Sequence, residues 1–279
     1  MMVSDQDYQL FLFALKTSSK YDFSQYSEKS LKRRILKVLT DHSMNITMLV
    51  SKIKSDPVFV EEVVKEVTVN TTELFRDPQV WQAIRFNILP RFKNNSVINI
   101  WHAGCSTGQE VYSMLILLNE MDMLDKARVY ATDINTDVMD IARGGEYKYR
   151  FNLSYLDNFD KVIKENPYNY EEYNDVPYSK YLDLDKSNDT IRLLPFLREK
   201  PVFKKHDLVT ENNTLYVKFD LILCRNVIIY FNYNLQCRVF DLFHQSLYDS
   251  GCLIMGMHET ILGNPASKFQ KKGHAYFKN

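Results

Sequence analysis

The first candidate for chemistry is a glycine turn at residues 104–108, with the sequence Gly-Cys-Ser-Thr-Gly. It follows an apolar run at residues 97–101 and precedes a helical pattern at residues 109–119. Glycine lets the backbone approach a ligand closely, and the free amides of a helix N-terminus favour negative or polar groups. Because the two glycines do not make the full dinucleotide-binding pattern, this turn alone fits a nucleotide site and an ordinary α/β turn equally well.

Asp133 is the second candidate. It follows the next apolar run, at residues 128–132, where an acidic side chain in this topology can bind both ribose hydroxyls of an adenosine group. Taken alone, an aspartate after a strand is more often a helix cap. The glycine turn and Asp133 together favour a cofactor that contains adenosine.

The elements that must position these residues alternate between two types. The apolar runs at residues 97–101 and 128–132 alternate with helical patterns at residues 109–119 and 137–143. Such alternation predicts an α/β fold with a doubly wound parallel sheet. The pattern resumes with a strand expected to be central, then a helix and another strand, at residues 219–223, 233–247 and 251–256.

The first hundred residues contain none of the eight glycines. Their patterns predict helices at residues 7–16, 30–39, 47–54, 58–66 and 81–89. Pro57 is placed to begin the fourth of these helices and Pro90 to close the fifth. We therefore expect an all-helical N-terminal domain with its linker over residues 1–72 and an α/β domain over residues 73–279.

Residues 149–205 separate the two halves of the α/β pattern and are rich in tyrosine. They end in three segments of alternating character, YLDLD, TIRLL and PVFKKHD. Alternation with a period of two is typical of half-buried strands. We predict a small antiparallel β insert over about residues 165–206.

Composition excludes several classes of protein. The chain has 279 residues, 35 basic and 35 acidic side chains and a formal net charge of +0, which argues against a general nucleic-acid binder. Its apolar runs are too short for a transmembrane helix, and its first residues lack the features of a secretory signal. The four cysteines form no CxxC pair, so we expect a reducing cytoplasm and no metal site.

Five segments, in order along the chain, carry a resemblance to a known family. They read NTTELFRDPQVW (70–81), AGCSTGQEVYS (103–113), ATDIN with ARGGEY (131–135 and 142–147), KHDL (205–208) and LILCRNVIIYF (221–231). This series resembles the motifs of the CheR family, the chemotaxis receptor glutamate O-methyltransferases. Residues 21–35 also resemble the helical substrate-recognition region of that family. The resemblance implies a Rossmann-like methyltransferase domain that uses S-adenosylmethionine.

The resemblance also implies roles for single residues. Asn70, Thr72 and Arg76 match positions that close over the cofactor, and the Arg76 guanidinium suits the methionine carboxylate. Tyr230 matches a catalytic position near the sulfonium, together with Arg76; without the motif, Tyr230 would be interpreted as a core aromatic. The other positions matched to the cofactor site are Glu110, Asp133, Asp207, Leu208, Arg225 and Asn226, of which Asp207 and Leu208 match the pair beside the adenine.

Three positions depart from the family pattern. Asp207 stands where most relatives carry asparagine, which removes one hydrogen-bond donor. Gln109 replaces the usual glutamate and Val111 the usual proline, and neither change removes Glu110. The roles of His102 and of the His258-Glu259 pair stay open.

The chemistry that the family implies needs no general base. A glutamate side chain has an ordinary pKa of about 4.3, so the acceptor carboxylate is already ionised at pH 7. Catalysis then reduces to aligning the reacting atoms and excluding water. Tyr230 is expected to donate to the acceptor carboxylate, and Arg76 to orient both partners.

A basic stripe marks the expected recognition helix. Lys29, Arg33 and Lys37 are spaced four residues apart, and residues 29–37 hold five cations and no acid. Such a stripe is usually a solvated face. Because the implied targets are glutamates on the cytoplasmic coiled coil of chemotaxis receptors, we predict that these three residues bind that partner.

Two other functions remain open. A scaffold or regulatory protein could keep the cofactor pocket on the same fold without turnover. A transferase acting on a nucleic acid or a small molecule is disfavoured by the neutral charge and by the lack of a tuned base. We expect a monomer that binds receptors without inserting into the membrane.

Overall fold

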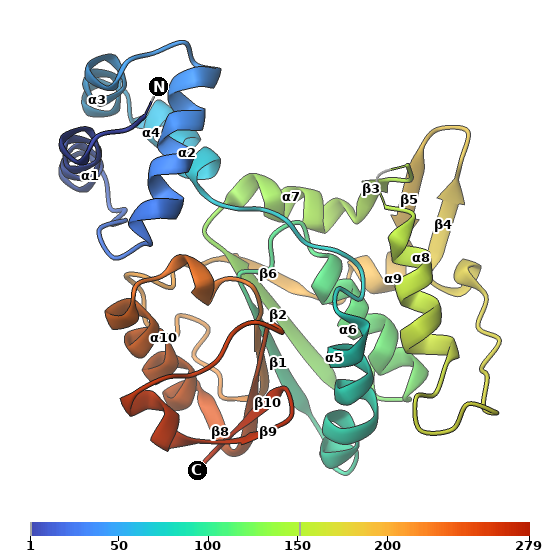
Figure 1. Ribbon diagram of the computed structural model, residues 1–279. Helices are drawn as coiled ribbons and strands as arrows, with labels where there is room; N and C mark the ends of the chain where they lie inside the picture. The colour runs from blue at the N-terminus through green and yellow to red at the C-terminus, as the bar shows by residue number, and fades with distance from the viewer. Residues whose placement is uncertain (1, 151) are drawn as a thin grey trace.

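The computed structural model describes residues 2–150 and 152–279. The chain begins with four helices that pack around a core of their own and stand apart from the rest of the molecule at the upper left of Figure 1. They are α1 (Asp5–Ser18), α2 (Glu28–Asp41), α3 (Ile46–Ser55) and α4 (Pro57–Val67). We call this unit the helical domain. All four helices predicted for it are confirmed, each one to two residues longer at either end.

Local capping explains where three of these helices, α1, α3 and α4, begin. Ser4 and Asp7 form a reciprocal capping box at the start of α1. Asp56 accepts hydrogen bonds from two amides of the first turn of α4, and Pro57 occupies the first helical position as predicted. The helical domain is therefore strongly encoded in local sequence.

A seven-stranded sheet forms the centre of the second part of the molecule, in the order β6-β2-β1-β7-β8-β10-β9. The first five strands in this order run parallel, whereas β10 runs antiparallel to both β8 and β9. The strands are β1 (Ile98–Ala103), β2 (Ala127–Asp133), β6 (Val202–Lys205), β7 (Phe219–Cys224), β8 (Leu247–Met255), β9 (Phe269–Lys272) and β10 (Ala275–Lys278). The doubly wound α/β prediction is confirmed, with an antiparallel edge that was not predicted.

Helices cover both faces of this sheet (Figure 1). One core includes the apolar side of α6 (Gln109–Glu120), and a second core includes that of α10 (Tyr233–Ser246). As a consequence, β1 and β7 are buried at every position, which confirms β7 as a central strand. The helix α7 (Thr136–Gly144) follows β2 as predicted.

The predicted helix at residues 81–89 is longer than expected. The chain is helical from α5 (Pro78–Ala83) through η1 (Ile84–Ile88) and η2 (Leu89–Phe92). Pro90 lies in the first turn of η2 and does not close the helix, so that expectation was wrong. Proline is tolerated at the start of a helical turn because its missing N–H has no partner there.

A second, three-stranded antiparallel sheet has the order β3-β5-β4. Its strands are β3 (Glu146–Lys148), β5 (Thr190–Leu193) and β4 (Leu182–Asp185), and α8 (Ser154–Phe159), η3 (Asp160–Lys164) and η4 (Tyr178–Lys180) lie between β3 and β4. Figure 1 shows this unit at the upper right, across the molecule from the helical domain. The predicted β insert is confirmed, but it begins earlier in the chain, at β3.

One predicted strand of the insert belongs elsewhere. The segment PVFKKHD forms β6, which pairs parallel with β2 at the edge of the main sheet, so its assignment to the insert was wrong. Alternate residues of β6 are exposed because it is an edge strand. Alternation reports a half-exposed strand but does not distinguish a parallel edge from an antiparallel pair.

The short elements that remain are α9 (Pro195–Arg198), η5 (Ile228–Tyr230) and η6 (Asn264–Lys268). No helix within the described ranges is both long and apolar enough to cross a lipid bilayer.

Candidate active site

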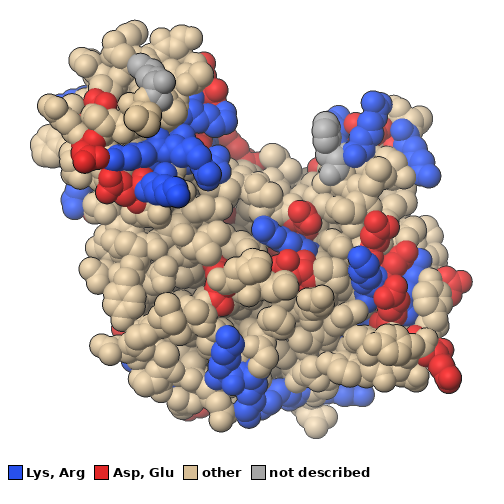
Figure 2. Space-filling view, in the orientation of Figure 1, with Lys and Arg blue, Asp and Glu red and all other residues tan. Residues whose placement is uncertain are grey.

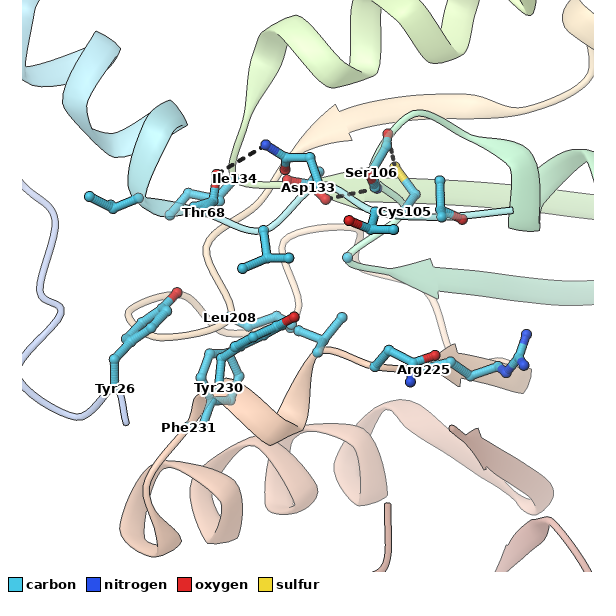
Figure 3. Close-up of a pocket in the computed structure, with 18 of the residues that line it drawn as sticks. Tyr26, Thr68, Cys105, Ser106, Asp133, Ile134, Leu208, Arg225, Tyr230 and Phe231 are labelled. Atoms are coloured by element: carbon cyan, nitrogen blue, oxygen red, sulfur yellow. Dashed lines mark hydrogen bonds between the residues drawn. The ribbon is translucent and has the colours of Figure 1, made fainter. Parts of the chain in front are cut away.

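A pocket opens where the carboxyl ends of four parallel strands meet the helical domain (Figure 3). The turns after β1, β2, β6 and β7 form one side of it. The linker after α4 and four residues of the helical domain, Tyr26, Ser30, Leu31 and Val67, form the other. Ligands bind at this edge of the sheet in open α/β folds.

The structure brings together every residue that was predicted to contact the cofactor or to act in catalysis. The pocket-lining residues include Asn70, Thr72, Arg76, Glu110, Asp133, Asp207, Leu208, Arg225, Asn226 and Tyr230. They come from five separate segments of the chain. Their individual roles stay predictions.

Gly104 shapes the turn that follows β1. Its φ of +81° favours glycine, and a Cβ atom built there would lie 2.6 Å from Cγ2 of Val227. The amides of Gly104 and Cys105 both donate to the carbonyl oxygen of Thr132, which ties the turn to β2. The turn therefore offers a bare backbone surface, as a bound nucleoside requires.

Asp133 is buried beside this turn. Its Oδ2 accepts a hydrogen bond from the Ser106 amide at 2.8 Å, and its Oδ1 accepts one from the Asn135 amide at 2.9 Å. Burial raises the pKa of Asp133, and these amide hydrogen bonds oppose that rise. Each oxygen keeps a further acceptor site, so the carboxylate fits the ribose diol expected for this position.

Glu110 is a second buried acid in the pocket. Its Oε1 lies 2.9 Å from Nδ1 of His102, and its Oε2 accepts a 3.3 Å hydrogen bond from Arg225. Burial acts to raise the pKa of Glu110, but the His102 hydrogen bond and the Arg225 charge outweigh it and lower the pKa. Glu110 is thus held as an anion, which suits the ammonium group of a methionine moiety. This contact answers the open question about His102.

Arg225 connects Glu110 to the linker. Its Nη2 donates to the Arg76 carbonyl at 2.7 Å and to Oδ2 of Asp77 at 2.9 Å, and its side chain is 2% exposed. Both Nη atoms of the guanidinium are thus occupied by protein acceptors, whereas Nε is buried without a partner among the described residues. Arg225 therefore orders the linker around the pocket, in addition to lining it.

Arg76 has a different environment. Its guanidinium makes one long hydrogen bond within the described residues, 3.4 Å from Nη1 to the Thr71 carbonyl oxygen. No carboxylate among those residues forms an ion pair with Arg76. The residue is half-buried at the pocket wall. Its guanidinium is therefore available to a ligand carboxylate, as the sequence predicted.

Asp207 and Leu208 line the side formed by β6. The Asp207 carboxylate accepts hydrogen bonds from the Val209 amide and from Oγ1 of Thr210, each at 2.8 Å. Its charge closes its own turn, which gives the departure from asparagine a local structural role. His206 also lines the pocket, which sequence reasoning did not foresee, and its Nε2 lies 2.8 Å from the Asn212 carbonyl.

Glu259 was left without a role by the sequence and now has one. Its Oε2 accepts hydrogen bonds from the Asn226 amide at 2.7 Å and the Gly256 amide at 2.8 Å. Asn226 has a left-handed φ of +60°, so the turn after β7 depends on this buried carboxylate. No local motif signals such a contact, because 33 positions separate the two residues.

Tyr230 enters the pocket from the side opposite Asp133 (Figure 3). It is half-buried, and its hydroxyl makes no hydrogen bond to any residue that the structure describes. Its carbonyl accepts the amide of Ser27 at 2.8 Å, which links the catalytic candidate to the helical domain. Tyr230 thus presents a free hydroxyl to a ligand.

The three predicted substrate residues, Lys29, Arg33 and Lys37, lie exposed on α2 and do not line the pocket. Lys37 forms an ion pair with Asp41 on the same helix. Figure 2 shows Lys and Arg side chains gathered on the part of the helical domain where Figure 1 places α2. The N-terminal end of the stripe lies near the pocket, because Ser30, on the first turn of α2, is one of the residues that line the pocket.

Comparison with known proteins identifies both parts of the chain. Residues 6–68 match the model of the CheR methyltransferase all-alpha domain, and residues 70–277 match that of the CheR methyltransferase SAM binding domain. The Cher3 protein of Pseudomonas putida is 34% identical and covers 92% of this chain and 90% of its own. The chemotaxis protein methyltransferase of Listeria monocytogenes is 30% identical, with 94% of this chain and 92% of its own covered.

Similarity to solved structures is much lower. The N-methyltransferase NodS from Bradyrhizobium japonicum, in complex with S-adenosyl-L-homocysteine, covers 66% of this chain and 62% of its own at 12% identity and a TM-score of 0.35. The family models and relatives, together with the pocket, lead to one conclusion: the chain belongs to the CheR methyltransferase family, and its cofactor is S-adenosylmethionine.

Proposed function

We propose that this methyltransferase transfers a methyl group to glutamate side chains of chemotaxis receptors, forming glutamate methyl esters. The observation that supports the proposal best is the position of α2. Its first turn lines the cofactor pocket through Ser30, while Lys29 and Arg33 stay exposed on the same helix. An acidic helical partner that binds this cationic face would bring its carboxylates to the mouth of the pocket.

When bound, S-adenosylmethionine supplies an electrophilic methyl group on a sulfonium. The acceptor carboxylate is ionised at neutral pH, so the protein does not have to remove a proton. Among the described residues the pocket holds one histidine, His206; its Nε2 contacts the Asn212 carbonyl, and its Nδ1 is buried without a partner. An acceptor that is already a nucleophile suits the site because it needs no base, whereas an amine or a hydroxyl would depend on that single histidine.

The residues of this chain then act by positioning. Tyr230 donates its free hydroxyl to the acceptor carboxylate, and because it is neutral it does not hold that anion in its ground state. Arg76 binds the carboxylate of the methionine moiety. Glu110, held as an anion, accepts from the ammonium of that moiety. Correct alignment of reacting groups can supply on the order of 7 kcal/mol.

The partner that fits this surface is the acidic cytoplasmic coiled coil of a chemotaxis receptor. The relatives named as chemotaxis protein methyltransferases support a role in chemotaxis. We propose that the protein acts in the cytoplasm as a monomer. Both domains needed for the pocket come from one chain.

The test is methyl transfer from labelled S-adenosylmethionine to cytoplasmic receptor fragments. Label that is released as methanol by base is the expected result, because carboxyl methyl esters hydrolyse in base. Receptor fragments with the acceptor glutamates changed to alanine are the matched control and should take up no label. Base-stable label would overturn the ester assignment. Binding of S-adenosylhomocysteine without transfer to any fragment would favour a scaffold.

A further inference from the structure

Tyr26 lies in the loop between α1 and α2, and it lines the cofactor pocket. Figure 3 shows its side chain entering the pocket beside Tyr230, with the hydroxyl pointing inward. Neither the motifs of the methyltransferase domain nor the basic stripe includes this residue. Among the described residues that the helical domain contributes to the pocket, Tyr26 is the aromatic one.

Backbone contacts with the catalytic segment hold Tyr26 in place. Tyr26 forms an isolated antiparallel bridge with Phe231. On either side of it, the Asn232 amide donates to the Gln25 carbonyl and the Ser27 amide donates to the Tyr230 carbonyl, both at 2.8 Å. Three consecutive residues of the helical domain are thereby attached to the segment that carries Tyr230.

Ring contacts restrict the side chain further. The Tyr26 ring packs edge-on against Phe231 with centroids 5.1 Å apart, and it lies tilted at 42° against Phe23 with centroids 4.5 Å apart. A ring held between two aromatic neighbours loses little further entropy when a ligand arrives. Tyr26 is therefore preorganised as part of the pocket wall.

The Tyr26 hydroxyl makes no hydrogen bond to the residues that the structure describes. Burial raises the pKa of Tyr26, and the negative charges of Asp207 and Asp133 add to the rise. The hydroxyl stays protonated at neutral pH and can donate. Asp133 and Asp207 stand at the positions expected for the ribose and the adenine, whereas the charged pair expected at the methionine end is Glu110 and Arg76.

We propose that Tyr26 is a cofactor-binding residue: its hydroxyl donates to the adenosine half of S-adenosylmethionine, and its ring covers that half. The helical domain would then complete the cofactor site in addition to recognising the protein substrate. This inference rests on the cofactor and not on the identity of the methyl acceptor. It predicts that cofactor binding holds the helical domain against the strand ends.

The test compares two ligands by calorimetry on the full chain. S-adenosylhomocysteine contains both halves of the cofactor, and 5′-methylthioadenosine lacks the amino-acid half. Tyr26→Phe removes only the hydroxyl and should weaken binding of both ligands by about five- to tenfold, since a hydrogen bond contributes about that factor. Tyr26→Leu, which also removes the ring, should weaken both further.

Tyr170→Phe is the matched control, because Tyr170 is 92% exposed and lies outside the pocket. Its affinity for both ligands should equal that of the wild type. Melting temperatures measured without ligand separate a binding effect from misfolding. Unchanged affinity of Tyr26→Phe for both ligands would overturn the proposal. So would weakened binding of S-adenosylhomocysteine with unchanged binding of 5′-methylthioadenosine, because Tyr26 would then face the methionine half.

Discussion

The two sides of the pocket differ in how their polar groups are satisfied. We call the turns after β1, β2 and β7 the strand-end wall, and Tyr26 with the first two turns of α2 the helical wall. In the strand-end wall Asp133 has two amide partners, and Glu110, on the helix that follows the turn after β1, contacts both His102 and Arg225. Glu259, which follows β8 outside the pocket, supports the turn after β7 through the Asn226 amide. This wall is built before any ligand binds.

The helical wall contains ion pairs of Lys32 with Asp5 and Glu28, but it also presents polar groups without partners. The Tyr26 hydroxyl and the cations Lys29 and Arg33 have no hydrogen-bond or ion-pair partner among residues 2–150 and 152–279. Free polar groups of this kind can exchange partners during turnover. The comparison indicates that contacts within the protein stabilise the strand-end wall, whereas the helical wall offers free groups to ligands: Tyr26 to the cofactor, as proposed above, and Lys29 and Arg33 to the protein substrate.

The largest expected effect comes from removing the ribose carboxylate. Asp133→Ala should weaken S-adenosylhomocysteine binding by roughly 1.5 to 3 kcal/mol, because hydrogen bonds to a charged group are lost. The free energy of unfolding should also fall by about 2 kcal/mol, since the amides of Ser106 and Asn135 lose their acceptor. Calorimetry and urea unfolding measure the two changes. Asp133→Asn, which keeps one acceptor oxygen, should be milder, and unchanged affinity in Asp133→Ala would refute the ribose assignment.

A smaller effect, restricted to turnover, is expected for Tyr230. Tyr230→Phe should lower kcat about tenfold, or about 1.4 kcal/mol of barrier, because it removes the hydroxyl but little volume. S-adenosylhomocysteine affinity and melting temperature should stay at the wild-type values. This pattern is the reverse of that expected for Tyr26→Phe, so the two variants are controls for each other. Full turnover in Tyr230→Phe would make Tyr230 a packing residue.

Charge reversals on α2 test the helical wall. Arg33→Glu should raise the KM for receptor by about threefold to fivefold, in line with roughly 1 kcal/mol for an exposed ion pair, and leave S-adenosylhomocysteine affinity unchanged. Lys37→Glu should raise the KM for receptor by a smaller factor, because Lys37 already forms an ion pair with Asp41. Reversing both should remove most of the salt dependence of receptor binding. Equal salt slopes for the double variant and wild type would show that the stripe is only a solvated face.

The smallest expected effect concerns the contact between the domains under acid conditions. Glu61 on α4 accepts a hydrogen bond from the hydroxyl of Tyr21 in the same domain. It also forms an ion pair with Lys205, the last residue of β6, at 3.2 Å. Burial acts to raise the pKa of Glu61, but these two partners outweigh it and lower the pKa below its ordinary value of 4.5.

A lowered carboxyl pKa stabilises the folded state above the ordinary value, and that contribution is lost as the pH falls through the lowered pKa. Wild type should therefore lose more stability than Glu61→Gln between pH 7 and pH 4, by less than about 1 kcal/mol because the pair is partly exposed. Urea unfolding at the two pH values measures this difference. An identical loss in both proteins would show that the contact does not stabilise the docking of the helical domain.

The helices and the strand-end wall were predictable because their signals are local. The turn at Gly104 lies between a strand and a helix in one short stretch, and Asp133 directly follows an apolar run. The segment that became β6 shows the limit of such reasoning. Its alternation is correct for an edge strand, but its partner β2 lies about 70 residues away and leaves no mark on the pattern.

By itself, the sequence predicted the helices of the first domain and the central strands of the main sheet, because their signals are local. Through its resemblance to a known family, it also predicted the cofactor and ten of the residues that line the pocket. Only the tertiary structure decided that Glu259 supports the turn of Asn226, that Arg225 connects Glu110 to the linker, and that Tyr26 enters the pocket. These contacts join residues between 33 and about 200 positions apart. Hydrogen bonds and packing across such separations depend on how the domains dock, and no periodicity within a single segment records that docking.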